Sequence, residues 1–398
     1  MLGRRLAAAT VALCAVLVAP APAQAVVCEQ APPKLPVFKG TPPEDEVYAP
    51  KRLAPIATGK GVRVAVVDSG VDATHPQLRD NVERGADFLH GDDNADQDCV
   101  GHGTEVASII AARPASDTGF QGLAPGATIV PVRISEQKEI DGKAVGDRGT
   151  PRQFAQAIDW AVDQGDAQVI NLSLVMTADN AEVAAAVQRA LDAGVVVVAA
   201  AGNNGAGQTE ADTPYPADFP GVIGVGAVTL DGTRADFSQK GDYVDLVAYG
   251  KDVTAAARGS GHLTDQGTSF STPFVTATVA LMLERFPGLT PAQVLQRLKA
   301  TADPPPGGTK EYGAGLLNPY RAITESLGPD TRNVAAPQVM HPDDPAVAAL
   351  AARRAHSQQM ALLFAAIGAG LVVLLAAAAL IVRRGRARGW RPAGPGHR

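Results

Sequence analysis

The chain has 398 residues, of which 46% are hydrophobic and 19% charged, an ordinary globular composition that excludes a disordered or collagen-like protein. Its formal net charge is -6, but eight arginines stand in the two ends without an acid, and removing these eight charges leaves -14 for the rest. This acidic body argues against nucleic acid as a partner, because phosphate contacts need a concentrated positive surface. Three cysteines exclude a disulfide-dense miniprotein and a multi-cysteine zinc module.

Residues 1–25 predict a secretory signal peptide. A pair of arginines precedes an apolar stretch at 6–18 that is too short to span a bilayer, and the small-x-small sequence at 23–25 fits a cleavage site. A lipoprotein anchor is the alternative, but the residues before Cys28 lack the leucine and the small residue that such a signal needs. The mature chain is expected to begin with a proline-rich extension, residues 26–54.

Residues 55–327 alternate between strand and helix patterns. Runs of β-branched and apolar residues predict buried strands at 62–68, 127–132, 169–174, 195–200 and 222–228, and helical periodicity predicts helices at 103–112, 151–164 and 180–193. This alternation is typical of one α/β domain with a mainly parallel sheet that is covered on both faces.

Three features of this domain receive ordinary structural interpretations. The polar stretch 136–150 has no apolar pattern, and we expect an exposed loop that is open to proteolytic cutting, rather than a binding element. The acids Asp72, Asp92, Asp93, Asp96 and Asp98 lack the regular spacing of a calcium loop and predict a solvated acidic loop, with no metal. No partner pattern surrounds His262, which is expected at the surface.

The C-terminal part predicts a membrane anchor. Residues 328–359 are expected to be a linker, because their first part shows no apolar periodicity and contains several Pro and Asp. Residues 360–382 carry no charge and would span roughly 34 Å as a helix, which is enough to cross the hydrocarbon core. The arginine-rich tail 383–398 then lies in the cytoplasm and the domain outside, by the positive-inside rule. A buried core helix is the alternative, although such helices seldom lack a polar stripe.

Two cysteines remain after export, because Cys14 leaves with the signal peptide. Cys28 and Cys99 then stand in a compartment where disulfides persist, and we expect them to pair. The bond would tie the proline-rich extension to the middle of the domain. Two free thiols are the alternative.

Three short motifs supply the groups that serine acyl transfer requires. Asp68 stands in DSG, His102 in GHGT and Ser269 in GTSFSTP. Each motif is weak alone, but together they provide an acid that orients the base, the base itself and a nucleophile. Ser269 precedes a predicted helix at 272–286, whose N-terminus favours developing negative charge. Asn203 follows a strand in a GNNG turn, where its amide is expected to bind the oxyanion.

At this point the sequence resembles the subtilisin-like serine proteases, whose triad follows the order Asp, His, Ser. The resemblance covers about residues 55–325 and includes VVDSGVD, GHGTEVA, GLAP, VINLS, AAGN and the motif around Ser269. It implies a three-layer α/β fold with a seven-stranded, mainly parallel central sheet. It also implies endopeptidase activity on protein or peptide substrates, without a cofactor.

The same resemblance places the substrate cleft. Its walls are expected at Ser173, Leu174 and Val175 on one side and at Ala200 and Gly202 on the other. Bulkier residues follow Leu174 where subtilases usually have two glycines, so the preference for the residue before the cleaved bond does not carry over.

The wider layout resembles the mycosins, the membrane-anchored subtilases of actinobacterial type VII (ESX) secretion systems. The shared features are the signal peptide, the short extension with one cysteine, the second cysteine three residues before His102, and one C-terminal membrane helix. The resemblance implies a type VII secretion membrane complex as partner and an extension that wraps the catalytic domain. Two alternatives stay open: a structural subunit of the secretion complex with proteolysis secondary, and a general cell-wall subtilase. The intact catalytic positions favour an active protease.

Overall fold

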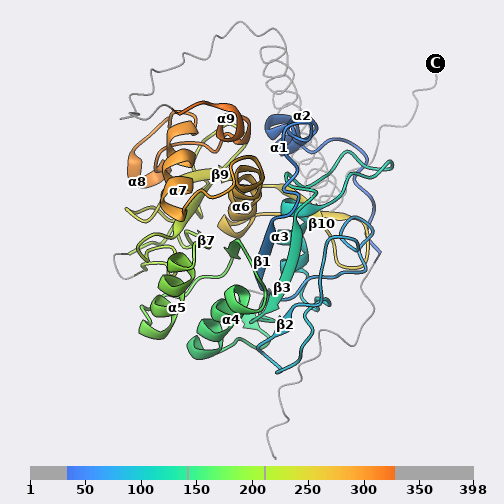
Figure 1. Ribbon diagram of the computed structural model, residues 1–398, viewed down its shortest axis with the longest axis vertical. Helices are drawn as coiled ribbons and strands as arrows, with labels where there is room; N and C mark the ends of the chain where they lie inside the picture. Colours follow the sequence, from blue (N-terminus) through green and yellow to red (C-terminus); the bar gives the residue numbers. More distant parts are fainter. Residues whose placement is uncertain (1–33, 141–142, 210–211, 328–398) are drawn as a thin grey trace, which may run out of the picture. The chain divides into compact units, whose positions relative to one another are not determined.

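The computed structural model describes residues 34–140, 143–209 and 212–327 (Figure 1). The predicted signal peptide, linker, transmembrane helix 360–382 and basic tail lie outside these residues, as does Cys28. Within the described ranges, no helix is both long and apolar enough to cross a bilayer.

A seven-stranded parallel sheet forms the centre of the domain, which confirms the predicted α/β fold. Its order is β2-β3-β1-β6-β7-β8-β9, and every neighbouring pair is parallel. The strands are β1 (Arg63–Asp68), β2 (Ala86–Asp87), β3 (Thr128–Arg133), β6 (Val169–Leu172), β7 (Val196–Ala200), β8 (Ile223–Val228) and β9 (Leu246–Tyr249). β2 and β9, the two outer strands, were not predicted.

Helices cover both faces of this sheet. Because side chains alternate along a strand, Val64 and Val66 of β1 enter one core, whereas Ala65 and Val67 enter the other. The first core packs against α3 (His102–Ala111) and α6 (Thr268–Arg285), and the second against α4 (Pro151–Asp163) and α5 (Ala181–Asp192). Figure 1 shows α4 and α5 next to each other below the central strands.

Smaller elements complete the described domain. They are the helices α1 (Pro43–Tyr48), α2 (Pro50–Leu53), α7 (Pro291–Thr301), α8 (Thr309–Tyr312) and α9 (Pro319–Thr324), and the hairpins β4 (Lys138–Ile140) with β5 (Lys143–Val145) and β10 (Val253–Ala256) with β11 (His262–Asp265). The expected surface loop at 136–150 contains a short hairpin that was not predicted, because β4 and β5 pair within it. The sequence signal was weak because these strands are only three residues long.

Candidate active site

Asp68 and His102 meet where β1 ends and α3 begins. The imidazole Nδ1 of His102 lies 2.7 Å from Oδ1 of Asp68, whose side chain is buried. The backbone N–H of Ser69 donates to the same oxygen at 2.8 Å. Because the carboxylate holds Nδ1 as the N–H donor, Nε2 is left as the nitrogen that can take a proton from a nucleophile.

Asp68 also sets the proton affinity of His102. Burial of the imidazole would lower its pKa, but the negative charge of Asp68 and their hydrogen bond outweigh it and raise the pKa of His102 to about 9. The imidazolium that forms during acyl transfer is therefore stabilised in this site.

The first turn of α3 approaches the DSG turn so closely that only glycine fits at position 103. A Cβ there would lie 2.0 Å from the carbonyl oxygen of Gly70 and 3.2 Å from Cβ of Asp68. The backbone N–H of Gly103 donates to Oγ of Ser69 at 2.9 Å, and this hydroxyl donates onward to Asp98 at 3.0 Å. These contacts fix the acid and the base of the site relative to each other.

Asp98 is a positioning residue that the sequence analysis placed in a solvated loop. The side chain is buried, and its Oδ1 accepts the N–H groups of Val100 and Gly101 at 3.0 and 2.8 Å. Its Oδ2 accepts both the N–H and the hydroxyl of Thr104, at 2.9 and 2.7 Å. The carboxylate thus anchors the N-terminus of α3, which carries His102. An acid four residues before the histidine, at the start of a predicted helix, was the available signal.

Ser269 is the second residue of α6, so this helix begins four residues earlier than predicted. The side chain is buried at the N-terminus of the helix, where the N–H of the preceding Thr268 donates to the side chain of Asn203. The ring of the next residue, Phe270, packs edge-on against the ring of His102 with centroids 5.6 Å apart. Within the described residues, the Ser269 hydroxyl and His102 are not hydrogen-bonded to each other; such bonds often tighten only with substrate.

A proline inside α6 explains how Ser269 is held. Pro273 has no N–H, so the carbonyl of Ser269 lacks its partner four residues along the helix. The hydroxyl of Ser173, just after β6, donates to that carbonyl at 2.9 Å instead. The amide of Asn171 in turn donates to the Ser173 hydroxyl at 2.9 Å. The sheet edge therefore fixes the residue at the nucleophile position.

Asn203 has a fixed orientation beside Ser269. Its Oδ1 accepts both the N–H and the hydroxyl of Thr268, each at 2.8 Å, which turns Nδ2 toward the open side. A Cβ on Gly267 would lie 2.9 Å from Oγ of Ser269 and 3.1 Å from Nδ2 of Asn203. The hydroxyl and the amide thus border one small space, as a nucleophile and an oxyanion donor must.

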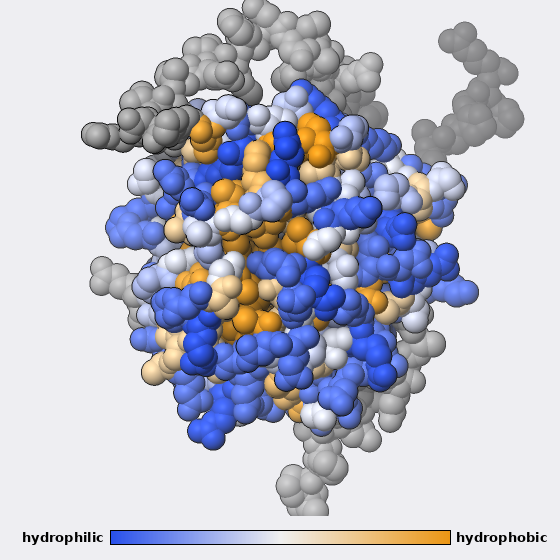
Figure 2. Space-filling view, in the orientation of Figure 1, coloured by the Kyte–Doolittle hydropathy of each residue, from blue (hydrophilic) through white to orange (hydrophobic). Residues whose placement is uncertain are grey.

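The residues expected to line the cleft have different exposures. Leu174 and Val175 are partly exposed, whereas Ser173, Ala200 and Gly202 are buried. Gly202 donates its N–H to the Thr268 hydroxyl at 3.1 Å, so it braces α6. On the face shown in Figure 2, apolar side chains gather in the middle, in the region of the central strands, with hydrophilic ones around them.

The residue pattern of the Subtilase family matches residues 59–315, within the predicted peptidase domain. The chain belongs to the subtilase family. It is 37% identical to subtilisin E of Bacillus subtilis over 273 residues, which cover 69% of this chain and 68% of the relative. It is 39% identical to subtilisin Savinase of Lederbergia lenta over 261 residues, which cover 66% of this chain and 90% of that relative. The chain is a subtilisin-like serine endopeptidase.

Solved structures add a narrower likeness. MycP1 from Mycobacterium smegmatis matches with a TM-score of 0.64 and 31% identity, over 75% of this chain and 89% of that one. A second MycP1 structure, described as a serine protease that is an essential component of the type VII (ESX-1) secretion system, matches with a TM-score of 0.63 and 33% identity, over 74% and 92%. The predicted resemblance to the mycosins is confirmed.

Cys99, three residues before His102, is disulfide-bonded and buried. Its expected partner, Cys28, lies outside the described residues, and their pairing stays a prediction.

Proposed function

We propose that the chain is a membrane-anchored serine endopeptidase that hydrolyses peptide bonds of secreted proteins and works with a type VII secretion complex at the outer face of the cytoplasmic membrane. The observation that carries the catalytic part is the hydrogen bond of 2.7 Å between Asp68 and His102, next to the space that Ser269 and Asn203 border.

These residues divide the reaction among them. Ser269 Oγ attacks the peptide carbonyl and passes its proton to Nε2 of His102, while Asp68 stabilises the imidazolium. The oxyanion accepts hydrogen bonds from Nδ2 of Asn203 and the N–H of Ser269. His102 then gives the proton to the leaving amine, and water hydrolyses the acyl-enzyme by the same steps in reverse order.

Sequence features support the location and the partner. The predicted signal peptide at 1–25 and the uncharged run at 360–382 favour a single-pass protein with its peptidase domain outside and its C-terminus in the cytoplasm. The likeness to MycP1, a component of a type VII secretion system, favours such a complex as partner.

Intact-mass analysis of the full-length protein after fluorophosphonate treatment tests the catalytic role. The wild type should gain one adduct and Ser269→Ala none. Ser271→Ala is the matched control, because the hydroxyl of this buried serine, two residues away, has no hydrogen-bond partner in the described part of the chain, and its loss should leave the adduct in place. An adduct on Ser269→Ala would refute the assignment.

The link to secretion is tested in cells. The wild-type gene should restore the normal processing of exported proteins to a deletion strain. If cleavage matters, the gene for Ser269→Ala should not restore it. Normal processing in the Ser269→Ala strain, with secretion lost only on deletion, would favour the structural role instead. A tag on the C-terminus that external protease removes from intact cells would contradict the proposed orientation.

A further inference from the structure

Arg148 stands on a backbone edge whose outer side has no partner within the described ranges. It pairs antiparallel with Ser135. Its neighbour Gly149 donates to the carbonyl of Ile134 at 2.8 Å, and Asp147 accepts the N–H of the residue after Ser135 at 2.7 Å. These two bonds flank Ser135 and Arg148, which therefore form a non-hydrogen-bonded antiparallel pair. In such a pair, the N–H and the carbonyl of each residue point away from the other residue. The backbone of Arg148 therefore faces away from Ser135.

A second free edge follows β6. Met176 exchanges two backbone hydrogen bonds with Tyr215, at 2.7 and 2.8 Å. The preceding residue, Val175, therefore turns its N–H and carbonyl to the opposite side. The guanidinium of Arg148 reaches that carbonyl and donates to it at 2.7 Å. Two open backbone edges thus border one gap, and the Arg148 side chain bridges it.

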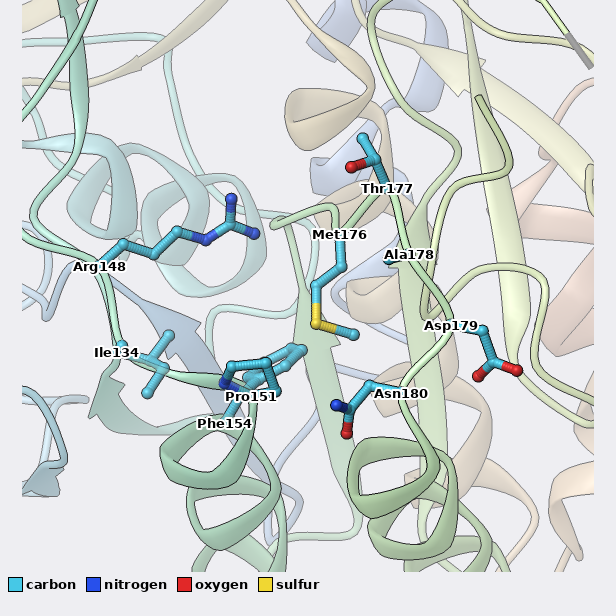
Figure 3. Close-up of a pocket in the computed structure, with 10 residues that line it drawn as sticks. Ile134, Arg148, Pro151, Phe154, Met176, Thr177, Ala178, Asp179 and Asn180 are labelled. Carbon is cyan, nitrogen blue, oxygen red and sulfur yellow. The ribbon is translucent and has the colours of Figure 1, made fainter. Parts of the chain in front are cut away.

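A cavity lies directly beside this bridge. Its volume is about 330 Å³, near the lower end for ligand sites. Figure 3 shows Arg148 reaching from one side across the cavity toward Met176, while Asp179 on the far side points away from it. The apolar part of the lining comes from Ile134, Pro151, Phe154, Met176 and Ala178. An extended peptide between the two edges could place an apolar side chain here.

The charge of Arg148 is not balanced by a neighbour among the side chains that the structure describes. Its side chain is exposed, and no acid of the described residues forms an ion pair with it. Arg152, in the first turn of α4, differs in this respect because it pairs with Glu182 at 3.4 Å. A neutral peptide that displaces Arg148 from Val175 breaks the hydrogen bond that the charged guanidinium donates to the Val175 carbonyl. A peptide with a carboxylate replaces that bond with a two-pronged ion pair to the guanidinium.

We propose that Arg148 determines substrate specificity by selecting peptides that carry an acidic side chain next to the residue that fills this cavity. The proposal rests on the proposed catalysis at Ser269. Ser173 contacts the Ser269 backbone, and the chain from Ser173 to Met176 leads from the nucleophile to the cavity. The acidic residue therefore lies within about four residues of the cleaved bond, at about 3.3 Å per residue.

Cleavage of internally quenched peptides by the full-length enzyme tests this assignment. The set compares Glu with Gln and Lys at each position within four residues of the cut. The wild type should prefer Glu over Gln about tenfold in kcat/KM at one position, and this preference should weaken at high salt. Arg148→Ala should cleave Glu and Gln peptides equally, and Arg148→Glu should prefer Lys. Arg152→Ala is the control and should keep the preference for Glu.

Two results would overturn the proposal: equal cleavage of Glu and Gln peptides by the wild type at every position, or a preference that survives in Arg148→Ala. Failure of the proposed function looks different, because the wild type would then cleave no peptide and gain no fluorophosphonate adduct.

Discussion

The N-terminal extension and the active site both rest on buried polar side chains, but they use them differently. In the described part of the extension, Oε1 of Glu44 accepts the N–H of Thr254 at 2.6 Å, and Oδ2 of Asp45 accepts the N–H of Gln121 at 3.2 Å. Burial raises the pKa of both carboxyl groups. Two acids of one short helix thus bind backbone groups of strand β10 and of a distant loop, and they hold the extension on the domain.

His262 completes this attachment, and its expected place at the surface is wrong. It is 8% exposed. Its Nδ1 accepts the N–H of Phe38 at 3.0 Å, while Nε2 lies 2.8 Å from Oε1 of Gln77 and donates to it. Both ring nitrogens of a neutral imidazole are therefore occupied, Nδ1 by the extension and Nε2 by a second segment of the domain.

The active site keeps polar atoms available instead. Among the residues that the structure describes, Asp68 Oδ2 is buried without a hydrogen-bond partner, and the hydroxyl of Ser269 and Nδ2 of Asn203 border one space. The comparison indicates how to distinguish two kinds of buried polar cluster. A structural cluster satisfies its atoms within the chain, whereas a catalytic cluster leaves donors and acceptors for substrate.

The strongest expected effect concerns Asp98, which lies in the active site but behaves like the structural cluster. Asp98→Ala should lower the free energy of unfolding by about 4 kcal/mol, because several buried donors lose their charged acceptor. Denaturant titration measures the change. Asp93→Ala, an exposed acid of the same loop, should change stability by less than about 0.5 kcal/mol. A loss below about 1 kcal/mol for Asp98→Ala would show that the anchor is not needed.

Substitutions of Asn203 test whether its Nδ2, which the site leaves available, donates to the oxyanion. Asn203→Ala should lower kcat about 10²- to 10³-fold with KM little changed, the loss known for the oxyanion donor of the related subtilisin. Asn203→Asp retains an acceptor for Thr268 but has no donor for the oxyanion. If kinetic assays show normal activity in Asn203→Asp, the bracing of Thr268 and not the donated hydrogen bond explains the effect.

The pKa of His102 predicts the pH dependence of the reaction. Only the neutral imidazole accepts the proton of Ser269, and its pKa is raised to about 9. The rate of fluorophosphonate labelling should therefore rise about tenfold per pH unit well below that value and about fiftyfold between pH 7 and pH 9. A rate that levels off near pH 7 would contradict the influence of Asp68.

The smallest expected effect concerns His262 under the extension. Burial, assisted by His75, lowers its pKa from 6.5 to about 4. The unfolded chain therefore binds a proton that the folded chain excludes, and the stabilisation present above pH 6.5 is lost as the pH falls toward 4. Unfolding should become easier by about 1.5 kcal/mol between pH 6.5 and pH 5.

Denaturant titrations at both pH values measure this loss. His262→Gln keeps one acceptor and one donor without titrating, so it should lack this part of the pH dependence while His75 still contributes. Equal pH dependence in the two proteins would exclude His262 as the cause.

The sequence was sufficient where one local pattern decides the structure. Five central strands were recognised because they are buried on both faces and therefore almost continuously apolar. Asp68, His102 and Ser269 were found because short motifs surround them, and the structure brings Asp68 and His102 together. β2 was missed because a two-residue strand has no periodicity.

The remaining residues depend on contacts that no local pattern shows. His262 finds its partners 185 and 224 positions away in the chain. Asp98 stands among several similar acids, and only the fold turns the donors of Thr104 and Gly101 toward it. Arg148 lies in a polar stretch whose role depends on β6, the strand that brings Val175 opposite it.

Pro273 has a consequence for how a peptide is aligned. It frees the Ser269 carbonyl to bind Ser173, and the chain continues from Ser173 directly into the edge at Leu174 and Val175. The nucleophile and the surface along which we expect a peptide to lie thus share one anchor. A small shift of that edge would carry the serine and the peptide together, so the distance between hydroxyl and scissile carbonyl should be less sensitive to thermal motion than either position alone.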